Sequence, residues 1–254
     1  MDAVKVPVVR DRVASLVADW RQHGTAYEVS RLITLPVRHG LVRLTVAHPE
    51  HLPIDGPAIV VANHVSFFDS VLLMFGLPRP VALLGKAEYT ERFVTRWLFC
   101  GAGMIPIRRE DPADAARAFD ELCKVIAAGG VVGIYPEGTR SRDGQLHRGH
   151  TGAAHLSLVT GAPIVPVGIG GTDRILPTGA RLVRPFRRAT IAVGAPIVPE
   201  AAGDRSSTNR ASTNRRRREL TDQMMREIRR LTGQHYVNEF APIQHAAAAP
   251  ATHG

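Results

Sequence analysis

The chain has 254 residues, 44% of them hydrophobic and 22% charged, a composition that excludes a wholly disordered protein and allows one large α/β domain. The formal net charge of +9 indicates an anionic partner, which can be nucleic acid, an anionic bilayer or a phosphorylated substrate. Two cysteines, Cys100 and Cys123, are too few for a disulfide framework or a cysteine-based metal site, and they fit a reducing compartment.

The N-terminal region carries no recognisable export signal. It has neither an uninterrupted apolar core nor a small-residue cleavage site, so we expect the protein to stay inside the cell. No apolar run approaches the ~18 to 20 residues that a membrane-spanning helix needs. The longest candidate, residues 71–78, is interrupted by Gly76 and ends at Pro78. The sequence therefore predicts no ordinary transmembrane span.

Residues 1–47 are predicted to form amphipathic helices, one over residues 8–22 and one over residues 26–46. In the second helix, aliphatic side chains are interleaved with arginines, a pattern typical of a helix lying in the membrane interface. A helix packed on its own domain, with its arginines in water, fits the same pattern. Pro36 kinks the helix in either case.

The main folded domain is predicted over residues 48–200, where short apolar runs alternate with helical stretches. The runs cover residues 57–62, 81–85, 104–107, 131–135, 164–168 and 190–193. Continuous apolar strands separated by helices predict an α/β fold with a mostly parallel or mixed central sheet flanked by helices. The clearest helix covers residues 112–128 and ends at Gly129 and Gly130.

The C-terminal region is polar and basic. Residues 201–240 are predicted to hold a loop and a helix that opens at the arginine run 215–218 and ends near Leu231, and residues 241–254 a disordered tail. The arginine run fits a solvated helix face as well as contact with phosphate or a bilayer. No Phe, Tyr or Trp lies between residues 187 and 235, so nucleic-acid bases have no stacking platform there and nucleic acid is not the expected partner.

Three of the predicted strands end in polar clusters. Residues 57–62 run into Asn63 and His64, with Asp69 five residues after the histidine. The strand over residues 104–107 ends in Arg108 and Arg109. The ends of strands are where open α/β sheets place their sites, so the joint pattern favours one shared site, although the His64 and Asp69 pair alone is a weak signal.

The third cluster follows the strand over residues 131–135. Gly138 allows backbone amides to approach an anion, Thr139 offers a hydroxyl, and Arg140 can bind a phosphate through two parallel hydrogen bonds. This turn therefore has the chemistry of a phosphate cradle. A plain turn with a solvated arginine is the alternative.

In these clusters the sequence resembles the glycerolipid acyltransferases, typified by 1-acylglycerol-3-phosphate acyltransferase. Four blocks of that family occur in order over about residues 45–200, and the third, YPEGTRS, is highly specific. The blocks are Asn63-His64 to Asp69, Gly103 to Arg108, Tyr135 to Ser141, and Ile164-Val165-Pro166-Val167.

The resemblance implies a reaction and assigns roles to residues. His64 would act as general base on the acceptor hydroxyl while Asp69 orients its imidazole, and the oxygen would attack an acyl thioester without a covalent acyl-enzyme. The acceptor phosphate would be bound by Arg108, Glu137, Gly138, Thr139 and Arg140, and Pro166 would shape the acyl-donor side. Because a carboxylate repels phosphate, Glu137 is expected to hold Arg140 or a backbone amide in place.

Further residues are possible members of the site. Asn63 belongs to the first block, Lys86 lies where relatives often carry a lysine, and Arg148 stands where many relatives carry a lysine after the third block. Ser66 lacks the context of a nucleophile elbow, so a serine hydrolase is not expected. No metal site is expected at the three neighbouring histidines, His147, His150 and His155.

The expected function is transfer of a fatty acyl group to 1-acylglycerol-3-phosphate, giving phosphatidate. The co-substrate would be an acyl-coenzyme A or acyl carrier protein thioester, with no other cofactor. The same blocks serve glycerol-3-phosphate, other lysophospholipids and glycolipid acceptors, which remain alternatives. We expect the protein at the cytoplasmic face of the cell membrane, bound peripherally to anionic lipid. A nucleic-acid-binding module and a lipid-binding protein without catalysis are the competing classes.

Overall fold

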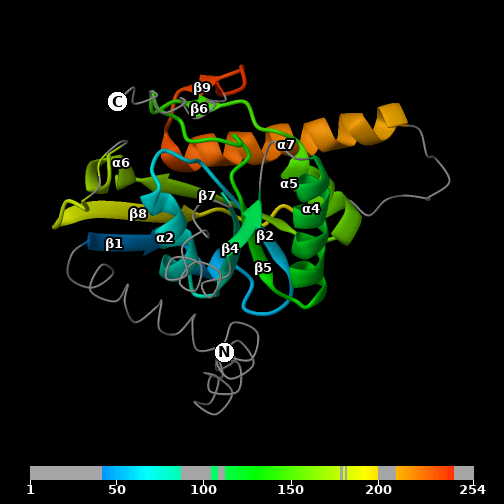
Figure 1. The fold of residues 1–254 in the computed structure, drawn as a ribbon, viewed down its shortest axis with the longest axis horizontal. Coiled ribbons are helices and arrows are strands. Elements are labelled where there is room, and N and C mark those ends of the chain that lie inside the picture. Colours follow the sequence, from blue (N-terminus) through cyan, green and yellow to red (C-terminus); the bar gives the residue numbers. More distant parts are fainter. Residues whose placement is uncertain are drawn as a thin grey trace, which may run out of the picture.

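The structure is a computed structural model that describes residues 42–86, 104–107, 112–177, 180, 182–199 and 210–242. A central sheet is flanked by helices on both faces, as Figure 1 shows. The predicted α/β class is therefore confirmed. The predicted helices before residue 42, the loop over residues 200–209 and the tail after residue 242 lie outside the described residues.

Seven strands form the main sheet in the order β1-β8-β7-β2-β5-β3-β4. All neighbouring pairs are parallel except β7 with β8, so the sheet is mixed. The strands are β1 (Val42–Ala47), β2 (Ala58–Ala62), β3 (Val81–Lys86), β4 (Met104–Ile107), β5 (Val131–Ile134), β7 (Ile164–Gly170) and β8 (Arg187–Val193). A second sheet pairs β6 (Leu146–His147) with β9 (Tyr236–Val237).

The helices are short except for α4 and α7. They are η2 (Pro49–His51), α2 (Phe68–Gly76), α4 (Pro112–Ala127), α5 (Gly152–Thr160), α6 (Thr172–Ile175) and α7 (Arg210–Thr232). After α4, Gly129 has a φ of 80°, in the left-handed region that favours glycine, which explains why the predicted helix ends here.

Two predictions of secondary structure are wrong in their bounds. Residues 42–46 were expected in a helix, but they form strand β1, whose burial alternates along the strand and which pairs with β8 over its whole length. Pairing with a distant strand outweighs the helical spacing of its aliphatic residues. Helix α7 begins at Arg210 rather than at Arg215. Its buried side chains, Leu220, Met224 and Ile228 among them, all lie after Arg215, so the additional first turn is not held by buried apolar residues.

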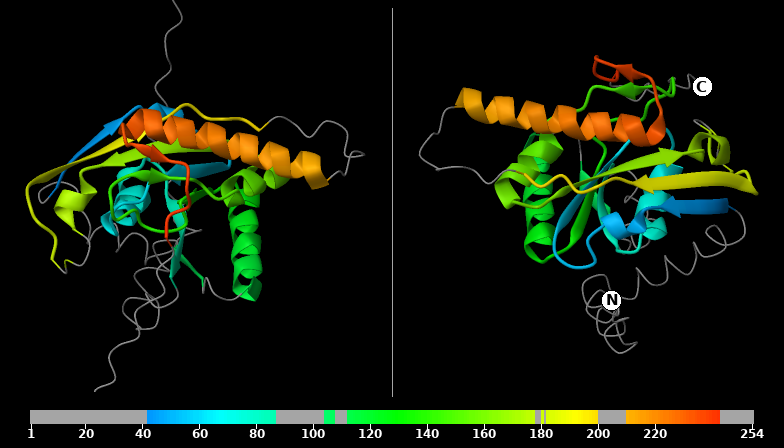
Figure 2. Two further views of the ribbon diagram at one scale, coloured as in Figure 1. Left: turned by 90° about the horizontal axis from the view of Figure 1, so that it is seen from above. Right: turned by 180° about the vertical axis from the view of Figure 1, so that it is seen from behind.

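The core has two halves, one on each face of the sheet. Along β2, Ala58, Val60 and Ala62 pack into one half. Ile59 and Val61 pack into the other, together with residues of α4, α5 and α7. Since β2 is packed on both faces, its position in the sheet is fixed. The segment that follows β2 therefore begins at a fixed point on the edge of the sheet. The views in Figure 2 show α7 crossing one face of the sheet.

Candidate active site

The site is built on the segment between β2 and α2. His64 lies two residues beyond the end of β2, and its Nδ1 is 2.9 Å from Oδ2 of Asp69, in the first turn of α2. The same oxygen accepts the backbone N–H groups of Val65 and Ser66, each at 2.8 Å. Asp69 is completely buried, so three N–H groups converge on one oxygen and fix both the loop and the carboxylate.

This geometry selects one tautomer of His64. A carboxylate can only accept hydrogen bonds, so Nδ1 carries the proton that it donates to Asp69. Nε2 is then the ring nitrogen that can take a proton from a substrate. The His64 side chain keeps 12% of its surface exposed while Asp69 keeps none. The two side chains thus lie at hydrogen-bond distance, which is the geometry that a general base and its orienting acid require.

Tyr135 is a neighbour of His64 to which sequence reasoning gave no role. Its ring stacks on the imidazole with centroids 3.9 Å apart and planes 10° from parallel. Its hydroxyl is 3.0 Å from Oγ of Ser70 on α2. Burial and then the nearby Asp69 carboxylate hold the pKa of the phenol well above its ordinary value, so the ring is neutral. The sequence signals were its place at the end of a predicted strand and at the start of the third block, and neither indicated a contact with His64.

Glu137 holds two loops together. One carboxylate oxygen accepts the backbone N–H of His64 at 3.1 Å, and the other accepts that of His147 at 3.0 Å. The residue is buried, and burial raises its pKa to about 7. Both oxygens are thus occupied by backbone amides. Of the two roles expected for Glu137, holding Arg140 or holding a backbone amide, the structure shows the second.

The turn that follows Glu137 lies against the His64 loop. The N–H of Ser141 donates to the carbonyl of His64 at 2.7 Å. Gly138 has a φ of 72°, and a β-carbon there would meet the ring of His150 at 3.1 Å, so glycine is required for the turn. Thr139 and Arg140 are half-buried. The His64 loop and the predicted phosphate cradle are therefore adjacent, because β2 and β5 are neighbouring strands.

The other predicted site residues are more spread out. Both amide atoms of Asn63 bond to the backbone of Ile169, at 2.9 and 2.8 Å, so this buried side chain fastens the end of β2 to β7. Pro166 lies within β7, is buried, and pairs in register with Val61, the residue before the end of β2. Any effect of Pro166 on an acyl donor stays a prediction.

The basic residues lie on different elements. Lys86 ends β3 and pairs in register with Ile107 of β4. Arg108, the next residue after β4, lies outside the described residues, and β4 is separated from β2 by β5 and β3. The guanidinium of Arg148 lies over the ring of Phe240, 5.2 Å from its centroid. That contact directs Arg148 to the C-terminal segment.

Ser66 and the three neighbouring histidines have other partners. The hydroxyl of Ser66 donates to the carbonyl of Leu176 at 2.7 Å, as suits a positioning residue and not a nucleophile. His147 contacts Asp143, His150 stacks on Phe240, and His155 stacks on Phe119. Each histidine is thus directed to a different contact.

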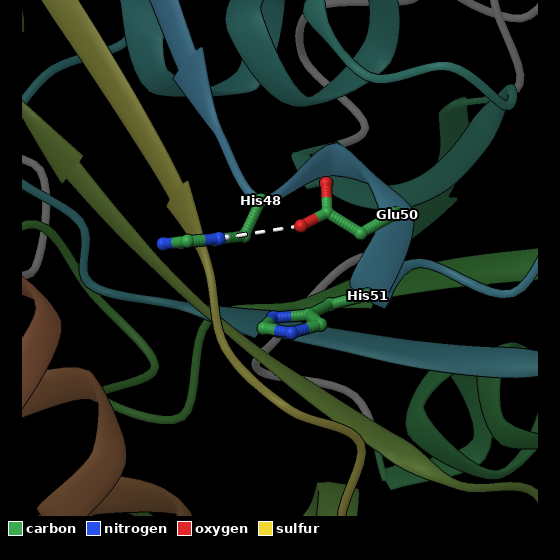
Figure 3. Close-up of side chains that lie close together, drawn as sticks. All are labelled: His48, Glu50 and His51. Carbon is green, nitrogen blue, oxygen red and sulfur yellow. Dashed lines mark hydrogen bonds and ion pairs between the residues drawn. The ribbon is translucent and has the colours of Figure 1, made fainter.

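One group in the described ranges brings together three side chains of kinds that bind metals, at the turn after β1. The ligand atoms of His48, Glu50 and His51 all lie within 4.8 Å of one another, and Figure 3 shows the carboxylate pointing at the His48 ring. Nδ1 of His51 is 2.9 Å from the carbonyl of Val193 at the end of β8. The turn follows β1, and in the strand order β8 and β7 lie between β1 and β2, the strand that leads to His64.

Comparison with known proteins identifies the family of the chain. A family model described as Acyltransferase matches residues 43–170, half of the chain. The chain belongs to the acyltransferase family. The matched residues run from β1 to the end of β7, and they contain His64, Asp69, Tyr135 and Glu137.

Two curated relatives carry the same printed name. The chain is 33% identical over 132 residues to the chloroplastic 1-acyl-sn-glycerol-3-phosphate acyltransferase BAT2 of Brassica napus, covering 52% of this chain and 38% of the relative. It is 31% identical over 145 residues to the human 1-acyl-sn-glycerol-3-phosphate acyltransferase alpha, covering 55% and 50%. The chain thus spans half or less of these relatives.

A solved structure supports the acyltransferase fold. It is the 1-acyl-sn-glycerophosphate (LPA) acyltransferase PlsC from Thermotoga maritima, with a TM-score of 0.57 and 24% identity over 74% of this chain and 73% of that one. Among the residues that the structure describes, no helix is long and apolar enough to cross a membrane.

Proposed function

We propose that this acyltransferase moves a fatty acyl group from a thioester to the free hydroxyl of 1-acylglycerol-3-phosphate, giving phosphatidate. The observation that carries the proposal is the bond between Nδ1 of His64 and buried Asp69, which presents Nε2 as a base at the sheet edge. The names of the relatives support the acceptor. The family membership supports the reaction class.

The chemistry needs no covalent enzyme intermediate. Nε2 of His64 takes the proton of the acceptor hydroxyl as its oxygen attacks the thioester carbonyl carbon. The carbon–sulfur bond then breaks, the ester forms, and the thiolate leaves with the proton from His64. Asp69 stabilises the imidazolium that forms in between. A positioned base of this kind contributes typically ~10²- to 10⁴-fold, and the alignment of the two substrates supplies more.

The phosphate of the acceptor is assigned to the turn after β5. Arg140 is half-buried there and makes no ion pair or hydrogen bond with another described residue. The next residue, Ser141, is bonded through its N–H to the carbonyl of His64. The guanidinium, one residue away from this hydrogen bond, can bind the phosphate of the acceptor while the hydroxyl of the same acceptor reaches His64. Arg108 would add a second charge from the end of β4.

The remaining parts of the proposal concern the partners. The donor would be acyl-coenzyme A or an acylated carrier protein, and the enzyme would meet its water-insoluble acceptor at the cytoplasmic face of an anionic membrane, bound peripherally. The net charge of +9 favours such a surface.

An assay with a panel of acceptors tests the proposal. Purified protein would be given one labelled acyl thioester and, in turn, 1-acylglycerol-3-phosphate, glycerol-3-phosphate, another lysophospholipid and a glycolipid. We expect the highest kcat/KM with 1-acylglycerol-3-phosphate and none above background for His64→Ala. Preference for another acceptor would overturn the assignment of the substrate but not of the reaction, whereas absence of transfer to every acceptor would overturn both.

A further inference from the structure

The loop that leads into β8 has an unusual surface. Leu182 is 82% exposed and Phe186 is 71% exposed, and Val183 between them is also exposed. Large apolar side chains gathered in one short loop leave apolar area in water, which costs free energy unless something covers them. The structure thus presents an apolar patch, which we define as Leu182, Val183 and Phe186.

Three arginines surround the apolar patch. Arg184, Arg187 and Arg188 are all exposed, and the segment contains no acidic residue. Phe186 has a φ of 59°, one of two positive values outside glycine in the described residues. That conformation is uncommon for an aromatic residue, and here the ring stays exposed. Apolar side chains flanked by cations are the composition that binds the boundary between lipid headgroups and acyl chains.

The loop lies at the same edge of the sheet as His64. Strands β2 and β7 are parallel with Ala62 opposite Val167, whereas β8 runs antiparallel to β7 with Thr190 opposite Gly170. Strand β8 therefore begins beyond the end of β7, on the side toward which β2 and β7 run. Arg187 also pairs with Val42, the first residue of β1. In Figures 1 and 2 the beginnings of β1 and β8 lie together with α6 at one end of the sheet.

Hydrogen bonds connect the loop to the catalytic segment. The N–H of Arg184 donates to the carbonyl of Ile175 in α6 at 2.8 Å. The hydroxyl of Ser66, three residues before Asp69, donates to the carbonyl of Leu176 at 2.7 Å. The loop is therefore placed against α6, and α6 against the His64 loop, so a surface bound by the loop lies next to the site.

We propose that Leu182, Val183 and Phe186 insert into an anionic lipid bilayer while Arg184, Arg187 and Arg188 contact its headgroups. This contact turns the His64 edge of the sheet toward the membrane that contains the acceptor. The biological role of this contact rests on the proposed function, whereas binding of the loop to the bilayer does not depend on catalysis. The charge selects an anionic bilayer over a neutral one, because clustered arginines near a surface gain from its negative potential.

Sedimentation with vesicles of phosphatidylcholine, with and without phosphatidylglycerol, tests the contact with the full-length chain. The double variant L182S/F186S should bind anionic vesicles about tenfold or more weakly, since two large apolar side chains no longer enter the interface. The triple variant R184Q/R187Q/R188Q should lose the preference for phosphatidylglycerol and most of the salt dependence.

The opposite edge of the sheet supplies a matched control. Ile54 is 83% exposed and Val198 is 73% exposed, before the start of β2 and after the end of β8. I54S/V198S removes a similar exposed apolar area, and we expect unchanged vesicle binding. Equal losses in I54S/V198S and L182S/F186S, or no loss in the loop variants, would overturn the proposal.

A spectroscopic readout tests insertion directly. The emission of the introduced tryptophan is obtained by subtracting the wild-type spectrum from that of F186W. This emission should shift to shorter wavelength on anionic vesicles and be quenched by brominated lipid, whereas the emission of the tryptophan in I54W should not change. Failure of F186W to respond, with vesicle binding intact, would overturn insertion of this loop.

Activity separates this proposal from the proposed function. L182S/F186S should retain kcat/KM toward a water-soluble short-chain acceptor and lose it toward the same headgroup embedded in vesicles. Absence of transfer to any acceptor would count against the proposed function alone, since binding and fluorescence remain measurable. A raised KM for a carrier-protein donor, with unchanged vesicle binding, would reassign the loop to an acidic protein and overturn the membrane contact.

Discussion

The imidazole of His64 lies against the ring of Tyr135, with centroids 3.9 Å apart and planes 10° from parallel. One face of the imidazole is therefore covered, while Asp69 fixes its Nδ1 edge. Stacking acts on the face of the imidazole and the hydrogen bond on its edge, so together they restrain both the tilt and the rotation of the ring. Tyr135 is thus a positioning residue, and its ring and its hydroxyl can be tested separately.

Replacement of Tyr135 by Phe or Leu distinguishes the role of its ring from the role of its hydroxyl. Tyr135→Phe keeps the stacked ring and loses the hydrogen bond to Ser70, so we expect a loss of about 1 kcal/mol in stability and little change in kcat. Tyr135→Leu loses the stacking, so kcat should fall by about tenfold, the equivalent of ~1.4 kcal/mol. Steady-state kinetics and urea unfolding of both variants check this, and equal kcat values for the two would contradict it.

Substitution of the catalytic pair should remove transfer without unfolding the domain. His64 lies beyond the end of β2 and not in the core, so His64→Ala should keep the wild-type circular dichroism while kcat falls by about 10²-fold or more. Asp69→Asn cannot accept all three N–H groups in the same way, so it should impair kcat severely and weaken the loop. A His64→Ala enzyme that retains more than about a tenth of the wild-type kcat would refute the general-base role.

Arg140→Ala should raise KM for a phosphate-bearing acceptor much more than KM for the acyl donor. Because a charge-assisted hydrogen bond to phosphate is lost, KM for the acceptor should rise by roughly 10- to 100-fold. Arg140→Lys should recover only part of the loss, because an ammonium group cannot form two parallel bonds. Arg142→Ala, at an exposed arginine two residues farther along the chain, is the matched control. A larger change in donor KM would move Arg140 to the donor side.

The pKa of Glu137 predicts a dependence of stability on pH. Burial raises the pKa from 4.5 to about 7 in the folded protein, so the folded state binds this proton more tightly than the unfolded chain does. The contribution of Glu137 to the free energy of unfolding therefore falls as pH rises between these values, by roughly 3 kcal/mol in all, and is constant at higher pH.

Urea unfolding of the wild type and Glu137→Gln across this pH range measures the effect. The difference in stability between the two proteins should change with pH because the glutamine does not titrate, and the other groups cancel. Glu137→Gln should also lower stability at every pH, since its amide nitrogen cannot accept one of the two backbone N–H groups. A difference that is constant with pH would contradict the raised pKa.

The sequence by itself determined the features that depend on short stretches of chain. The buried strands at residues 58–62 and 131–134 follow from continuous apolar runs, and the pairing of His64 with Asp69 spans only one loop and the first turn of a helix. Local spacing is sufficient there, because few conformations join a strand to a helix over five residues.

Only the tertiary structure decided the features that depend on strand order. Tyr135 reaches His64, and Glu137 its backbone N–H, because β5 lies beside β2, an order that the sequence of elements does not reveal. Asn63 fastens two strands 106 residues apart in the chain, and residues 42–46 become a strand because β8 pairs with them. Such contacts form between segments far apart in the chain, so no local pattern of spacing or propensity specifies them.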